Sequence, residues 1–161
     1  MKKFFCAALA LMISVCFFSC AAEYKNDVKV SAITEKIKAA LPLADGYAEH
    51  DGDYLIYRFE DIEEHIDGYS IIYSSDTRYA DLVAVFHAKS TSDAKEALDI
   101  CKDFIADQRT LFGAVVEQYL PSEGEKLDSA EARAFGNYVV VCVLTSKDAE
   151  TAFSTVEKEL S

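Results

Sequence analysis

Glycine and proline are scarce in this chain, with six and two residues among 161. So little of both excludes a collagen-like repeat and a long disordered segment rich in these residues. No stretch reaches the roughly 20 consecutive apolar residues that a membrane-spanning helix needs. The chain instead has 51% hydrophobic and 27% charged residues. This composition is typical of one globular domain, which at this size forms a core without disulfides or a metal.

The common signatures of enzymes are also absent. The sequence contains no Gly-x-Ser-x-Gly, no His-Glu-x-x-His, no glycine-rich phosphate loop and no Cys-x-x-Cys pair. Basic residues are outnumbered, since 16 Lys and Arg stand against 28 Asp and Glu, and the formal net charge is −12. A body this acidic lacks the positive surface that binds phosphate backbones, which excludes nucleic acid as a partner.

The N-terminus has the layout of a bacterial export signal. Lys2 and Lys3 precede an apolar run from Phe4 to Phe18, and small residues follow. Residues 20–40 then carry four lysines and three acidic residues, so the end next to the signal is the basic end of an acidic protein. This polarity would hold the domain off anionic lipid headgroups, although it also agrees with simple solubility.

The end of this signal resembles the lipobox of bacterial lipoproteins. In Phe17-Phe18-Ser19-Cys20, a small residue precedes a cysteine, while Phe17 replaces the usual Leu. The resemblance implies a signal peptide over 1–19, a diacylglyceryl anchor on Cys20 and a short tether over 20–29. The mature protein is then expected at the cell membrane, on its extracytoplasmic side. Ordinary cleavage after Ala22 would instead release a soluble secreted protein.

Hydrophobic periodicity predicts a single α+β domain over 30–161. It indicates helices over 30–41, from 91 onward and after 145, with hairpins of 70–74 with 82–88 and of 126–135 with 138–144. The two strand-strand-helix units look alike and would pair into a two-layer sandwich of about four mostly antiparallel strands, with two helices on one face and an N-terminal helix. Strand 138–144 is apolar on both sides, so its second side needs a cover, from the N-terminal helix, from 43–68 or from a partner protein.

Several segments together are similar to one family of uncharacterised lipoproteins, catalogued as domain of unknown function 4358. After the lipobox and the first helix, they are Asp-Ile-Glu-Glu at 61–64, Asp-Leu-Val-Ala-Val-Phe at 81–86 and Phe-Gly-Asn-Tyr-Val-Val at 135–140. The resemblance implies an envelope lipoprotein without an assigned activity, and therefore implies no catalytic residue. This chain departs from the family in its length, because it continues as a helix to Ser161.

Acidic side chains are densest over 45–67, where nine carboxylates and two imidazoles accompany a single arginine. The candidate ligands of a divalent cation in this segment are His50, Asp51, Asp53, Glu64 and His65. A calcium loop beginning at Asp51 fails, because Ile56 and Ile62 occupy the positions that need Gly and a bidentate acid. A solvated acidic face remains the alternative to a metal site.

Two cysteines, Cys101 and Cys142, remain in the domain and fall on the inward sides of a predicted helix and strand. Export permits one disulfide between them, and burial as two inert thiols is the alternative. A catalytic pair of Cys101 with His87 is conceivable. Burial of Cys101 on the packing side of a helix argues against that pair, because it raises the pKa of a thiol.

The sequence therefore predicts a binding or interaction module of the cell envelope, with the membrane and an envelope protein as partners and no cofactor. The alternative is a receptor for a cation or small ligand that uses 45–67. The third possibility is a hydrolase of unknown substrate, for which no convincing nucleophile, base or metal is found.

Overall fold

The computed structural model describes residues 24–43, 46–50, 58–76 and 78–161. The helices are α2 (Val30–Ala40), α4 (Thr91–Tyr119), α5 (Pro121–Asp128) and α6 (Ser146–Leu160), with a short 3-10 turn, η1 (Ile62–Glu64). The strands are β1 (Tyr47–Glu49), β2 (Ile66–Ser74), β3 (Leu82–Ala88), β4 (Glu131–Phe135) and β5 (Tyr138–Val143). Within these described residues, no helix is long and apolar enough to cross a membrane.

All described strands form one antiparallel sheet in the order β1-β2-β3-β5-β4. Two hairpins, β2–β3 and β4–β5, lie side by side because β3 pairs with β5, with Leu82 opposite Val143 and His87 opposite Tyr138. The β4–β5 turn uses Gly136 at φ 62°, a backbone conformation that glycine adopts without strain. The predicted turn at Gly136-Asn137 is thereby confirmed.

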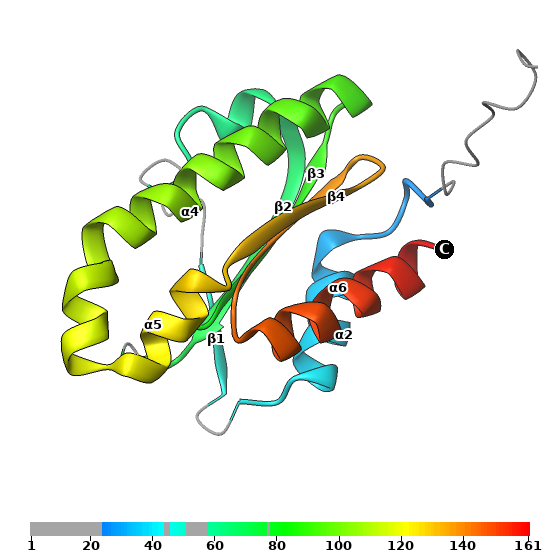
Figure 1. Ribbon diagram of the computed structural model, residues 1–161. Coiled ribbons are helices and arrows are strands. Elements are labelled where there is room, and N and C mark those ends of the chain that lie inside the picture. The colour runs from blue at the N-terminus through cyan, green and yellow to red at the C-terminus, as the bar shows by residue number, and fades with distance from the viewer. Residues whose placement is uncertain (1–23, 44–45, 51–57, 77) are drawn as a thin grey trace, which may run out of the picture.

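Helices cover both faces of the sheet (Figure 1). α4 and α5 pack on one face, over a core that includes Ile71, Phe86 and Val141. α2 and α6 pack on the other face, over a core that includes Val85 and Val140. Neighbouring residues of β3 and β5 thus point into different cores, which explains why β5, and β3 as far as Phe86, are apolar on both sides.

The α+β class, the antiparallel sheet and the N-terminal helix are confirmed, whereas the arrangement in layers differs from the prediction. The helices that follow the two hairpins, α4 and α6, lie on opposite faces, so the sheet is the middle of three layers. What the two units share is a helix start: Ser90 with Asp93 and Thr145 with Asp148 form the same capping arrangement. A shared helix start fixes where a helix begins and leaves open which face of the sheet it covers.

Two elements were not predicted. β1 adds a fifth strand at the edge of the sheet, next to β2. Residues 121–128, of which 126–128 were expected in a strand, form α5, a helix with Pro121 in its first turn. Proline fits there because the first turn leaves its backbone N–H groups unbonded in any case.

The segment before α2 is docked on the domain. The backbone N–H of Lys25 donates to the carbonyl of Leu160 (2.7 Å), and the hydroxyl of Tyr138 donates to the carbonyl of Val28 (2.7 Å). Tyr24 packs edge-on against Phe135 with 5.7 Å between ring centroids. From Tyr24 on, the predicted tether is therefore part of the folded domain, at the end of the sheet that carries the β4–β5 turn.

Candidate binding cavity

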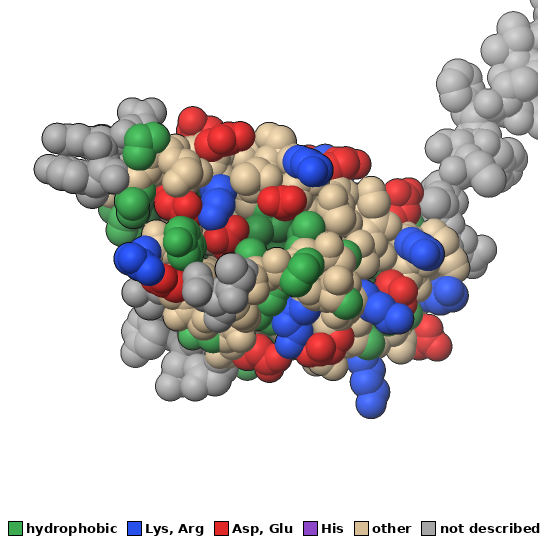
Figure 2. Space-filling model, turned by 90° about the horizontal axis from the view of Figure 1, so that it is seen from below, with side chains coloured by type: hydrophobic (Ala, Val, Ile, Leu, Met, Phe, Trp, Pro, Cys, Tyr) green, Lys and Arg blue, Asp and Glu red, His purple; other side chains and the backbone are tan. Residues whose placement is uncertain are grey.

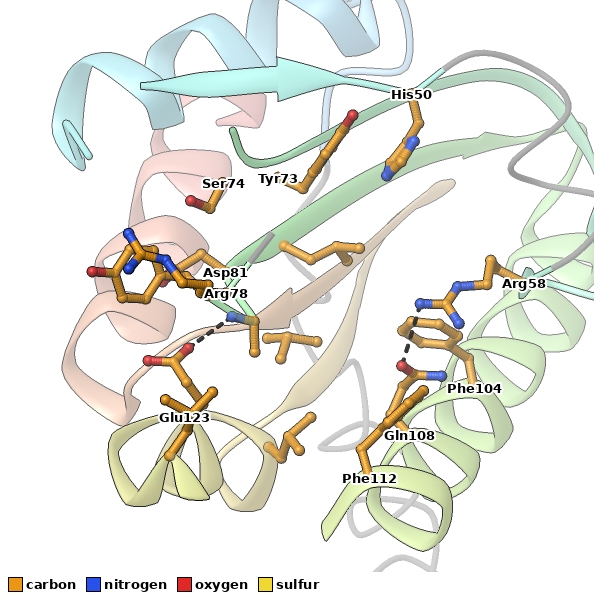
Figure 3. A pocket seen from close by; sticks show the side chains of 16 residues that line it. His50, Arg58, Tyr73, Ser74, Arg78, Asp81, Phe104, Gln108, Phe112 and Glu123 are labelled. Carbon is orange, nitrogen blue, oxygen red and sulfur yellow. Dashed lines mark hydrogen bonds between the residues drawn. The ribbon is translucent and has the colours of Figure 1, made fainter. Parts of the chain in front are cut away.

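A cavity of about 460 Å³ lies between α4, α5 and the turn that joins β2 to β3. Figure 3 shows its walls: α4 on one side, α5 and the start of β3 on the other, and the end of β2 between them. The lining is His50, Arg58, Tyr73, Ser74, Arg78, Tyr79, Ala80, Asp81, Leu82, Phe104, Gln108, Phe112, Leu120, Glu123, Leu127 and Val143. Residues that lie far apart in the sequence therefore meet at one hollow.

The greater part of the lining is hydrophobic, with aromatic rings on more than one side. Phe104 is buried, whereas Tyr79, Phe112 and Leu120 are 44%, 42% and 43% exposed. Figure 2 shows a face on which hydrophobic side chains gather in a hollow that acidic and basic side chains border. Exposed apolar side chains grouped around a hollow are typical of a surface that binds something.

Three charged side chains form an acidic corner beside the cavity: Asp81 and Glu123 line the cavity, and Lys126 pairs with both. Nζ of Lys126 lies 2.7 Å from Oδ2 of Asp81 and 3.0 Å from Oε2 of Glu123. The two carboxylates are nearly withdrawn from water, with side chains 10% and 4% exposed. Oε2 of Glu123 also accepts a hydrogen bond from the backbone N–H of Ala80 (2.7 Å), which ties α5 to the start of β3.

Lys126 keeps its charge in this environment. Burial by itself lowers the pKa of the ammonium group, but the hydrogen bonds to Asp81 and Glu123 outweigh burial and raise the pKa above its usual value. One positive charge thus stands between two carboxylates, and the acidic corner formally carries one negative charge.

Nearby, Arg78 pairs with Asp76 through Nε (3.0 Å to each carboxylate oxygen), and this hydrogen bonding lowers the pKa of Asp76 to about 2. That pair is neutral as a whole and does not offset the charge of the acidic corner.

The opposite wall carries a cation and an amide. Nη2 of Arg58 lies 3.4 Å from Oε1 of Gln108, and the guanidinium carbon stands 5.9 Å from the centre of the Phe104 ring. At the β2 side, the imidazole of His50 stacks on Tyr73 at 3.7 Å and an angle of 11°. The cavity therefore presents a positive wall, an aromatic middle and an acidic corner.

Of the predicted metal ligands that the structure describes, His50 lies apart from Glu64 and His65. The backbone N–H of His50 bonds to the carbonyl of Ile71 in β2, whereas His65 directly precedes β2, six residues before Ile71 and about 20 Å from it at 3.3 Å per residue. His65 instead bonds to Asp93 (3.1 Å), and Glu64 is exposed. Asp51 and Asp53 lie outside the described residues. The described residues contain no group of three or more side chains that could hold a metal ion.

The two cysteines and His87 are also separated. Cys101 is buried between α4 and the sheet, whereas Cys142 is buried on the α6 side, and both thiols are free. Burial raises the pKa of each thiol far above its usual value. His87 shares the face of Val85, away from α4, and contacts Asp67 and Asn26, so it forms no pair with Cys101.

Of the residues that line the cavity, only His50 was predicted from the sequence as a metal ligand. Sequence reasoning missed Asp81, Glu123 and Lys126, because Asp81 and Lys126 are 45 residues apart and meet only after α4 and α5 fold back on the sheet. The sequence offered one local indication, because Glu123 and Lys126 are three residues apart, a spacing at which side chains pair on a helix. Since 126–135 was expected to form a strand, that pair was not predicted.

Comparison of the chain with protein-family models, with curated proteins and with solved structures finds no match. The class that the fold and the cavity define is thus an α+β domain with one sheet between two helical layers and a ligand-sized cavity at one end of the sheet. The proposal for its function therefore rests on the geometry of the cavity.

Proposed function

We propose that the protein is a lipid-anchored binding module on the extracytoplasmic side of the cell membrane, and that it binds a small, partly apolar ligand in the cavity between α4 and α5. The observation that carries the binding part is the cavity itself. Its volume of about 460 Å³ falls within the range of small-molecule sites, and its apolar lining with a few polar groups is their usual composition.

The anchoring part is supported by the lipobox at Cys20 and by the docked tether. Cys20 lies four residues before Tyr24, the first described residue, and four residue steps span at most about 14 Å. The end of the sheet that carries the β4–β5 turn would therefore lie close to the bilayer. The resemblance to the lipoproteins of domain of unknown function 4358 stays a prediction that agrees with this placement.

The cavity and the end of the domain that would face the membrane lie at opposite ends of β3. Leu82, at the start of β3, lines the cavity, whereas His87 lies beside the docked tether. Five residues of strand place them about 17 Å apart. A ligand would thus bind at the end of the domain that is remote from the membrane.

Two neighbouring residues of α4 allow a sharp test of the cavity. Phe112 lines the cavity, whereas Leu111 does not, although it is more exposed (66% against 42%). Fluorescence titration of the purified protein with an environment-sensitive apolar dye should show binding that Phe112→Asp abolishes and Leu111→Asp preserves. Equal binding by both variants would contradict the proposed site.

A further inference from the structure

We infer that the cavity selects a zwitterionic amphipathic molecule, a short peptide with an aromatic side chain. Its ammonium group would bind at the acidic corner of Asp81, Glu123 and Lys126, and its carboxylate at Arg58. The inference rests on the proposed function, because it names the ligand class of the same cavity. It follows from the way the cavity distributes its charges.

The acidic corner has one ammonium group for two carboxylates and can bind a second cation. A carboxylate withdrawn from water is costly unless it is paired, and here one ammonium group serves two carboxylates. The carboxylate of Asp81 accepts its hydrogen bond from Lys126 through Oδ2. Within the described part of the chain, no buried side-chain oxygen lacks a hydrogen-bond partner, so Oδ1 of Asp81, to which no protein group donates, is open to the cavity that Asp81 lines. An ammonium group of a ligand would supply that donor and balance the charge.

Arg58, on the opposite wall of the cavity, can bind the carboxylate of such a ligand. A guanidinium presents several N–H donors in one plane and binds a carboxylate through two of them. Gln108, whose Oε1 accepts from Arg58, adds an amide beside it. Arg58 and Gln108 lie on the α4 side of the cavity, and Asp81 and Glu123 lie on the α5 and β3 side (Figure 3). The two charged ends of a ligand would therefore bind to opposite walls.

Hydrophobic and aromatic side chains occupy the space between these walls. Leu82, Phe104 and Phe112 line it together with Tyr73 and Tyr79. Aromatic rings favour a second ring in an offset or edge-on contact, and they also attract a cation over their faces. A molecule with an ammonium group, an aromatic side chain and a carboxylate matches this order of surfaces better than an alkyl chain or a sugar does.

The test is isothermal titration calorimetry of the purified protein with four probes: tyrosine, leucyl-tyrosine, N-acetyl-leucyl-tyrosine and leucyl-tyrosine amide. We expect leucyl-tyrosine to bind, and tyrosine to bind more weakly, because the ammonium and carboxylate groups of a free amino acid share one carbon and cannot reach opposite walls. Blocking either end of the peptide should weaken binding about tenfold or more, because each block removes a charge-assisted hydrogen bond. Asp81→Asn should erase the penalty of N-acetylation, and Arg58→Gln should erase the penalty of the amide.

Asp81→Asn keeps the volume of the side chain, whereas Arg58→Gln shortens it, and thermal unfolding of both variants shows that they are folded. Equal affinity for the free and the blocked peptides would overturn the inference and leave the proposed function standing. Failure of all four probes would overturn it as well, provided that the apolar dye still binds in a Phe112-dependent way. Loss of that dependence as well would contradict the proposed function itself.

Discussion

Lys126 is the residue on which the cavity end of the protein depends most. Its ammonium group holds together α5, which carries Glu123, and the start of β3, which carries Asp81. Removing one member of a buried ion group leaves the others charged and unpaired, which destabilises more than the intact group stabilises.

Lys126→Met should therefore lower the free energy of unfolding by about 3 kcal/mol. The control is Lys102→Met, which breaks an exposed pair with Asp99 (2.7 Å) and should cost less than about 1 kcal/mol. Urea denaturation of both variants measures the difference. Adding Glu123→Gln to Lys126→Met should recover part of the loss, and similar losses in the two single variants would contradict the account.

The thiols give a second prediction at this scale. Cys101 and Cys142 are both buried, and burial raises the pKa of each, so neither is present as a reactive thiolate. A thiol reagent should leave both unlabelled in the native Cys20→Ala protein and label both in urea, as counted by mass spectrometry. Fast labelling of native Cys101 would restore the possibility of a catalytic cysteine.

Among the elements, α4 shows most clearly how a local interaction positions a helix. Asp93 sits in its first turn, where Ser90 donates to one carboxylate oxygen and His65 contacts the other. The hydrogen bond from Ser90, and then that from His65, lower the pKa of Asp93 below its usual value. Asp93 thereby joins the start of α4 to the start of β2.

The sign of the pH dependence follows from this shift. A carboxyl group whose pKa is lower in the folded state stabilises the protein above its unfolded pKa, about 4, and loses this effect as the pH falls through the folded pKa. Unfolding measured between pH 5 and pH 2 should therefore show the stability difference between wild type and Asp93→Asn shrinking with acid. A difference that stays constant over this range would contradict the role of Asp93, and Asp103→Asn, on the exposed side of α4, is the control substitution.

The sequence was sufficient for elements whose signals are local. The two hairpins, the helices that begin near 91 and 145, and the first helix were all predicted from periodicity and turn residues. The face that each helix covers was not predictable, because β3 is equally apolar on both sides. β1 was missed because its three residues are too short to show an alternating pattern.

At the scale of the whole molecule, the docked tether and the cavity lie at opposite ends of the sheet. If Cys20 is acylated, this arrangement fixes the orientation of the domain. Cys20→Ala should then move the protein from the membrane fraction to the medium, as followed by cell fractionation. An unmodified Cys20 in the wild-type protein would exclude the anchor.

The orientation itself is measurable with a fluorophore on an introduced cysteine. Ser92→Cys places the label at the start of α4, next to the β4–β5 turn, and Ser122→Cys places it on α5, at the cavity end; both sites are exposed. A quencher attached to lipid headgroups in vesicles should quench the label at 92 more strongly than the label at 122. Equal quenching, or the reverse order, would contradict a cavity remote from the membrane.

The most direct test of binding through the cavity is photo-crosslinking in intact cells, with p-benzoylphenylalanine replacing Phe112 in one strain and Leu111 in another. These neighbours share one helix, and only Phe112 lines the cavity. The account predicts a small-molecule adduct, seen as a defined mass increase of the membrane-bound protein, at position 112 and not at 111. The same adducts at both positions, or none at 112, would contradict it.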